Sequence, residues 1–153
     1  MRMKRTGLGF LAIAGAVLLT PVPTQAHHAF AAEFDANRPI AVKGTIARVD
    51  WINPHAWIHV DVKNKEGKVE RWMFELTNVG SLSRRGVTKT TPEMKPGTEI
   101  EAEGFLSKGQ PRRANGRVLK YSNGQTLFVG SSGTGAPSDG LDPTESGPAK
   151  KKP

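Results

Sequence analysis

Cysteine is absent from all 153 residues, and its absence excludes several kinds of structure and chemistry. No disulfide can staple the fold, and no thiolate can act as a nucleophile or a metal ligand. A lipoprotein is excluded too, because no cysteine is present to carry the lipid at a cleavage point. An exported domain of this composition must be held together by burial alone.

The chain also lacks an apolar run long enough to cross a bilayer. The run within residues 7–20 has roughly a dozen apolar positions, whereas a spanning helix needs about 20. A basic start precedes this run, and the small residues Thr24 and Ala26 follow it, which is typical of a secretory signal peptide. We therefore expect residues 1–26 to be cleaved after Ala26, leaving a periplasmic protein with no stable membrane anchor. An uncleaved anchor remains the alternative.

Most catalytic signatures are missing. The sequence has no G-x-S-x-G elbow, no phosphate-binding loop and no H-E-x-x-H helix. Glu99, Glu101 and Glu103 alternate along one expected strand, which indicates a solvated outer face. Asp50 and Glu75 stand alone at strand ends, and we assign them no role. These absences favour a protein that is not an enzyme.

What is present between residues 39 and 130 is a two-residue apolar period, the pattern of half-buried strands. Gly44 interrupts the first strand and predicts a bulge or bend. The expected strands cover residues 40–51, 57–62, 69–76, 98–106, 117–121 and 125–129. The one exception is residues 78–86, where Asn78 can cap a short helix and Gly86 can end it.

Three strands, a short helix and further strands follow the order of the OB-fold. We therefore predict an all-β domain with one short helix, a small OB-fold-like antiparallel barrel of five or six strands over residues 39–130. An antiparallel sandwich is the alternative. Phe30 and Phe34 lie four apart, so one helical turn would pack the segment 27–38 on the barrel. The Gly-, Pro- and Ser-rich tail, residues 131–153, is expected to be disordered.

Four histidines carry the remaining chemical signal. On an extended strand His55 and His59 would be roughly 13 Å apart, too far to share one ion unless the chain folds back at Pro54. His27 differs, because cleavage after Ala26 would give it a free α-amine with a pKa of about 7.7–8.0. The amine and Nδ1 of the same residue form a chelate ring around one ion.

A third nitrogen from His28 or His55 would complete a site that suits Cu(II), the ion at the top of the divalent affinity order. The sequence thus predicts a metal site of His27, His28 and His55, with copper as its ion. The plain alternative is that histidine follows the cleavage point by chance, at a frayed amino terminus.

A second function class is binding through an aromatic and basic surface. Such a surface would combine Trp51, Trp57 and Trp72 with Arg71, Arg84, Arg112, Arg113 and Arg117, and Asn53 and His59 would also contribute to ligand binding. Export makes nucleic acid an improbable target, so an anionic envelope ligand or a protein partner is the expected occupant. The plain alternative places a tryptophan in the core and the arginines in solvent.

Five stretches carry a family resemblance: residues 26–35, 42–46, 50–57 with W-I-N-P-H, 82–86 and 95–97. In these stretches the chain resembles DUF6152, an uncharacterised family of exported bacterial proteins, from about residue 26 to residue 130. The resemblance implies a small periplasmic β-rich domain with no established activity. His27, His28 and His55 match the family's histidine motifs. The loop 87–94 and the tail depart from the pattern.

Overall fold

The computed structural model describes residues 27–131, 136 and 137. The predicted signal peptide and most of the predicted disordered tail therefore lie outside the described residues. Within the tail, the carbonyl of Pro137 accepts a hydrogen bond from Arg117 Nη2 at 3.3 Å. In the part of the chain that is described, no helix has the length and apolar character needed to cross a membrane.

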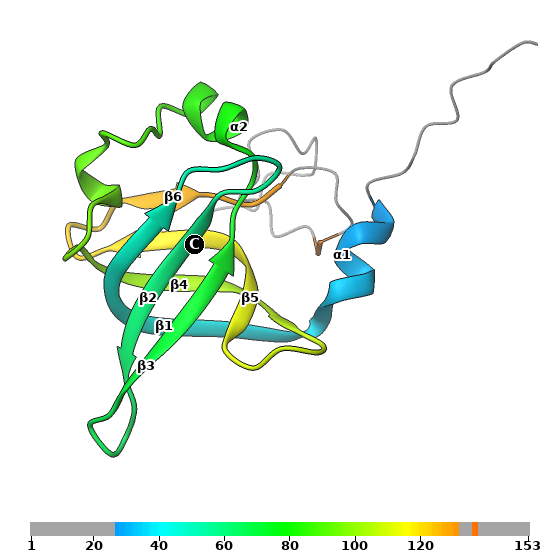
Figure 1. The fold of residues 1–153 in the computed structure, drawn as a ribbon, viewed down its shortest axis with the longest axis horizontal. Coiled ribbons are helices and arrows are strands. Elements are labelled where there is room, and N and C mark those ends of the chain that lie inside the picture. The colour runs from blue at the N-terminus through cyan, green and yellow to red at the C-terminus, as the bar shows by residue number, and fades with distance from the viewer. Residues whose placement is uncertain (1–26, 132–135, 138–153) are drawn as a thin grey trace, which may run out of the picture.

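Six strands form one sheet that closes on itself (Figure 1). Its order is β3-β2-β1-β4-β5-β6, and a parallel pairing of β3 with β5 closes the ring, whereas the other pairings are antiparallel. The strands are β1 (Phe34–Asp50), β2 (Trp57–Lys63), β3 (Val69–Glu75), β4 (Glu99–Ser107), β5 (Arg113–Tyr121) and β6 (Thr126–Phe128). The predicted class, an OB-fold-like ring with six strands, is confirmed.

Two strands begin earlier than predicted. β1 starts at Phe34 rather than near residue 40, and β5 starts at Arg113 rather than at residue 117. Residues 35–38 show no apolar alternation and lie in a register shift, and β1 pairs with β4 on either side of it, at Phe34 opposite Ser107 and at Pro39 opposite Phe105. Pairing across the sheet, which no local pattern reveals, therefore extends both strands.

Gly44 is needed for a close approach between strands, and the bulge predicted there lies elsewhere. The register shift between β1 and β2 falls between Ile46 and Arg48. A Cβ on Gly44 would sit 2.4 Å from the carbonyl oxygen of Asp61. The glycine thus lets β1 approach its neighbour β2 closely, whereas the bulge lies two to four residues later in the strand.

The short helix after β3 is confirmed as α2 (Val79–Arg84). Asn78 Oδ1 accepts a hydrogen bond from the Ser81 amide at 2.8 Å, and Gly86 ends the helix with a φ of 80°. Leu82 is the buried anchor of this helix in the core. Two more short helices lie among the described residues, α1 (His27–Glu33), where a helical turn next to Phe30 and Phe34 is predicted, and the 3₁₀ helix η1 (Pro92–Met94), which the sequence does not predict.

The core fills the inside of the ring. Its fully buried large side chains are Ile46, Ile58, Val60, Phe74, Leu76, Leu82, Leu119 and Val129. On β4 the predicted alternation holds, because Ile100 and Ala102 are buried while Glu101 pairs with Lys43 at 3.2 Å and Glu103 pairs with Lys120. The glutamate row therefore points away from the core.

α1 lies beside the ring at the start of β1, well away from α2 (Figure 1). Phe30 and Phe34 are both buried, their ring centroids are 5.8 Å apart, and Phe30 meets Phe105 edge-on at 5.6 Å. Lys108 Nζ also donates a hydrogen bond to the carbonyl of Ala31 at 2.5 Å. These contacts attach the amino-terminal helix to the ring.

Candidate functional site

A cleft of about 280 Å³ lies where α1, the loop between β1 and β2, the end of β3 and the start of β5 meet. Its lining includes Phe30, His55, Trp57, Glu75, Arg113 and Asn115. A larger hollow of about 660 Å³ lies over β1 and β4. Many of the charges around that hollow neutralise each other, as in the pairs Lys43–Glu101 and Arg71–Asp61. The smaller cleft is the one that brings together nitrogen and oxygen atoms that could bind a ligand.

The loop after β1 holds His55 in one orientation. The Asn53–Pro54 peptide bond is cis, and Ala56 pairs with the chain after β3 through hydrogen bonds at 3.1 and 2.8 Å. His55 Nδ1 lies 3.2 Å from the carbonyl oxygen of Leu76. A carbonyl only accepts, so Nδ1 carries the proton of this bond, and Nε2 is the ring nitrogen left for another partner.

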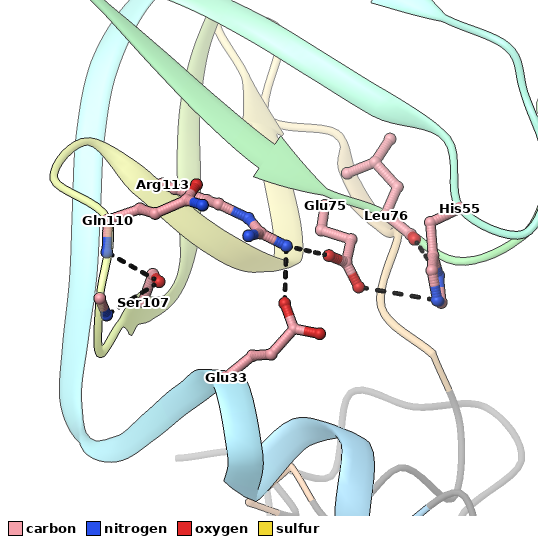
Figure 2. Close-up of polar contacts among 8 residues, drawn as sticks. Glu33, His55, Glu75, Leu76, Ser107, Gln110 and Arg113 are labelled. Carbon is pink, nitrogen blue, oxygen red and sulfur yellow. Dashed lines mark hydrogen bonds and ion pairs between the residues drawn. The ribbon is translucent and has the colours of Figure 1, made fainter.

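Arg113 ties α1 to β3 (Figure 2). Its Nη2 donates to Glu33 Oε2 at 2.7 Å and to Glu75 Oε2 at 3.1 Å. The guanidinium lies 4.9 Å from the ring centroid of Trp57 and 5.5 Å from that of Phe34, both favourable cation–π distances. Arg113 is thus fixed by two carboxylates and two aromatic rings.

The free edges of His55 and Glu75 face each other. His55 Nε2 lies 3.7 Å from Glu75 Oε1, on the side of the carboxylate that Arg113 does not occupy (Figure 2). The Glu75 side chain is only 12% exposed. An imidazole nitrogen and a carboxylate oxygen at this separation can meet around a cation.

Asn115 adds a second unpartnered acceptor to the same wall. Its side chain is buried, and Oδ1 has no hydrogen-bond partner among the described residues. β5 places it directly opposite Glu75 in the parallel pairing with β3. Buried carbonyl oxygens normally receive a donor or a cation, so Asn115 Oδ1 favours a positively charged or hydrogen-donating ligand, whereas the buried Nε of Arg113, also without a partner among the described residues, favours an acceptor.

The predicted ligand-binding residues do not form one surface. Asn53 and Trp57 line the cleft, whereas Trp51 packs against the core and is half-buried. His59, expected on the outer face, is buried, and its Nε2 donates to Asp50 Oδ2 at 2.9 Å. The imidazole can be buried there because Asp50, at the end of β1, is its polar partner, and Arg48 Nη2 lies 3.1 Å from the same ring nitrogen.

His55 and His59 therefore belong to separate environments, as the spacing along the strand predicts. His27 and His28 begin α1, and their side chains lie outside the described part of the structure. The backbone of His27 comes three residues before Phe30, which lines the cleft. Among the described residues, no group of three or more His, Cys, Asp or Glu is arranged to hold a metal ion.

Sequence reasoning gave no role to Glu75 or Asn115, and it named Arg113 only as part of an arginine surface for an anionic ligand. Glu75 was within reach, because the hairpin turn at residues 64–67 sets a register that pairs Trp57 with Glu75, beside His55. Arg113 and Asn115 carry no such local signal. They enter the cleft through the parallel pairing of β3 with β5, which joins segments 40 residues apart.

Comparison with known proteins adds one finding. Residues 16–115 match the model of a family of unknown function, DUF6152. The match includes α1, the W-I-N-P-H loop, Glu75 and both of the cleft residues on β5, and it ends before β6. No curated protein and no solved structure matches the chain.

Proposed function

Because the chain belongs to the DUF6152 family, whose function is unknown, we propose from its own geometry that the mature protein binds one Cu(II) ion through His27 and His55. In this proposal the signal peptide is cleaved after Ala26, the protein is periplasmic, and binding rather than catalysis is its role. His27 supplies its α-amine and Nδ1, which chelate the ion together. His55 Nε2 supplies the third nitrogen, and His28 is the alternative source for it.

The observation that carries the proposal is the orientation of His55. The hydrogen bond from Nδ1 to the Leu76 carbonyl fixes the ring and leaves Nε2 as the nitrogen that faces the cleft. Metal-binding histidines commonly have this arrangement, in which the second ring nitrogen donates to a carbonyl or carboxylate. The ring is therefore already oriented as a ligand.

The position and charge of the cleft support the same ion. α1, which starts at His27, is attached to the cleft by Phe30 and by the Glu33–Arg113 ion pair. Two carboxylates, Glu33 and Glu75, surround the single guanidinium of Arg113, so negative charge is in excess. Such a balance favours a cation over an anion.

Calorimetry with Cu(II) tests the proposal on the mature protein that begins at His27. We expect one tight site, and a loss of at least about tenfold in affinity when the α-amine of His27 is acetylated, because the chelating amine is then an amide. Equal affinity of the free and the acetylated protein would overturn the proposal.

The source of the third nitrogen is tested by His55→Ala and His28→Ala under the same conditions. We expect the first variant to weaken copper binding and the second to leave it near the wild-type value. His59→Gln is the matched control, since it removes an imidazole that lies outside the cleft while keeping a donor for Asp50. A control as damaging as His55→Ala would indicate a loss of folding instead.

The alternative function, an anionic envelope ligand or protein partner on a tryptophan and arginine surface, has less support. Arg113 is engaged by Glu33 and Glu75, and Arg71 forms a two-bond pair with Asp61. Arg117 is buried under Phe128. A salt-sensitive change in tryptophan fluorescence with an anionic oligosaccharide, in the absence of copper, would favour this alternative.

A further inference from the structure

We propose that Glu75 supplies an oxygen ligand to the same ion and that Arg113 is the positioning residue that aims it. This inference rests on the proposed copper site and extends it from three nitrogens to three nitrogens and one oxygen. It gives a role to the most deeply buried carboxylate of the cleft, which the sequence leaves unassigned.

The first argument is the separation of the two donor atoms. Nitrogen and carboxylate ligands of a first-row ion such as Zn²⁺ lie at about 2.0–2.1 and 2.0–2.2 Å, so two ligands of one ion are at most about 4.3 Å apart. His55 Nε2 and Glu75 Oε1 are 3.7 Å apart, within that limit and beyond an ordinary hydrogen bond. One ion fits between them with an open bond angle and without moving either side chain far.

The second argument is the way Arg113 divides the carboxylate. Glu75 Oε2 accepts from Arg113 Nη2 at 3.1 Å, whereas Oε1 points to His55 (Figure 2). Arg113 is itself held by Glu33 and by the rings of Phe34 and Trp57. The carboxylate is therefore oriented for binding through one oxygen, in the way that outer hydrogen bonds orient ligating carboxylates.

The third argument comes from Asn115, which stands opposite Glu75 on β5. Its side chain is 6% exposed, and its Oδ1 accepts no hydrogen bond from any described residue. Asn115 Oδ1 thus adds an acceptor to the cleft that holds the Glu75 carboxylate and His55 Nε2, and Arg113, whose buried Nε also has no partner among the described residues, is the cation of that lining. A water bound to the ion can donate to Asn115 Oδ1, and a tetragonal set of nitrogen and oxygen donors suits Cu(II).

Electron paramagnetic resonance and calorimetry of the Cu(II) complex test the inference. Glu75→Gln is expected to lower affinity about 100-fold and to change the parallel copper hyperfine coupling, since a charged oxygen ligand is lost. Arg113→Lys, which keeps the charge but not the planar guanidinium, is expected to lower the affinity for copper about tenfold. Glu70→Gln on the same strand, where Glu70 meets only Asn64 among the described side chains, is the matched control and should match the wild type.

Unchanged affinity and an unchanged spectrum in Glu75→Gln would overturn the inference. If the protein acetylated at the His27 amine still loses copper in that case, the proposed function stands without Glu75. If acetylation has no effect, or the wild type binds no copper, the proposed function itself fails. Should Glu75→Gln not fold, Glu75→Asp takes its place, because it withdraws the carboxylate by one methylene, and wild-type binding by it would equally overturn the inference.

Discussion

His59 and Asp50 form a polar pair at the edge of the core, where the sequence suggests an exposed ligand. His59 is buried, and its Nε2–H donates to Asp50 Oδ2 at 2.9 Å. Burial alone would raise the pKa of Asp50, but the hydrogen bonds from His59 and Arg48 outweigh it and hold that pKa below its ordinary value. The pair is therefore a stabilising element of the fold.

Asp50→Ala is predicted to lower the free energy of unfolding at neutral pH by about 1–3 kcal/mol, because the buried imidazole loses its acceptor. A carboxyl whose folded pKa is lowered stabilises the fold above its unfolded pKa, near 3.8, and this contribution disappears as pH falls through the folded value. In urea unfolding, the difference in free energy of unfolding between Asp50→Ala and wild type should become smaller below about pH 4.

Asp61→Ala is the control for Asp50, since it breaks the exposed pair with Arg71 and should cost less. A gap between Asp50→Ala and wild type that stays constant down to pH 2 would contradict the assignment. So would equal effects of the two substitutions at neutral pH.

Tyr121 gives stability the opposite dependence on pH, in the alkaline range. Burial, with a smaller contribution from Glu93, raises the pKa of Tyr121 from 10.0 to about 12. A phenol with a raised folded pKa contributes stability that is complete below pH 10 and is lost as pH rises to about 12. Over that interval the free energy of unfolding of the wild type should therefore fall by about 2 kcal/mol more than that of Tyr121→Phe. Parallel stability curves for the two proteins between pH 9 and 12 would rule this out.

Among single residues, the sequence identifies those whose role is local. Asn78 and Gly86 are predicted as helix start and stop, and both act so. Glu75 is left without a role because its partners, His55 and Arg113, come from other parts of the chain. A residue whose function depends on long-range pairing has no local pattern by which to find it.

At the scale of elements, the alternation of apolar residues predicts strands but not their full length. β2 and β3 match the expected ranges closely, because both are bounded by turn residues. β1 and β5 run further, since their extra residues are held by neighbouring strands. The position of Gly44 is predicted as irregular, but its physical reason is contact between strands.

Gly44→Ala is therefore predicted to destabilise the protein by about 1–3 kcal/mol through overpacking. The added Cβ would lie 2.4 Å from the Asp61 carbonyl oxygen and 2.8 Å from a methyl of Val60, so β1 and β2 must separate. Gly109→Ala is the matched control, because nothing lies within 4 Å of its Cβ position. Equal midpoints of thermal unfolding for the two variants would show that β1 and β2 separate without a loss of stability, which would contradict the prediction.

At the scale of the whole molecule, the order of strands and helix predicts the closed ring. The order indicates an OB-fold-like arrangement, and the parallel pairing of β3 with β5 completes it. That same pairing brings Glu75 beside Arg113 and Asn115, while the phenylalanines of α1 attach the amino-terminal helix to the cleft. The cleft is thus a product of ring closure, which explains why the sequence does not predict that Glu75, Arg113 and Asn115 meet His55 there.

The account depends on an ion shared by the first residue of the mature chain and the imidazole oriented by Leu76. A crystal structure of the mature, copper-loaded protein measures this most directly, through the distance from His27 Nδ1 to His55 Nε2. We predict one ion bonded to both atoms, which places them no more than about 4.2 Å apart. Copper bound at His27 with His55 Nε2 beyond that distance, or copper bound at neither residue, would contradict it.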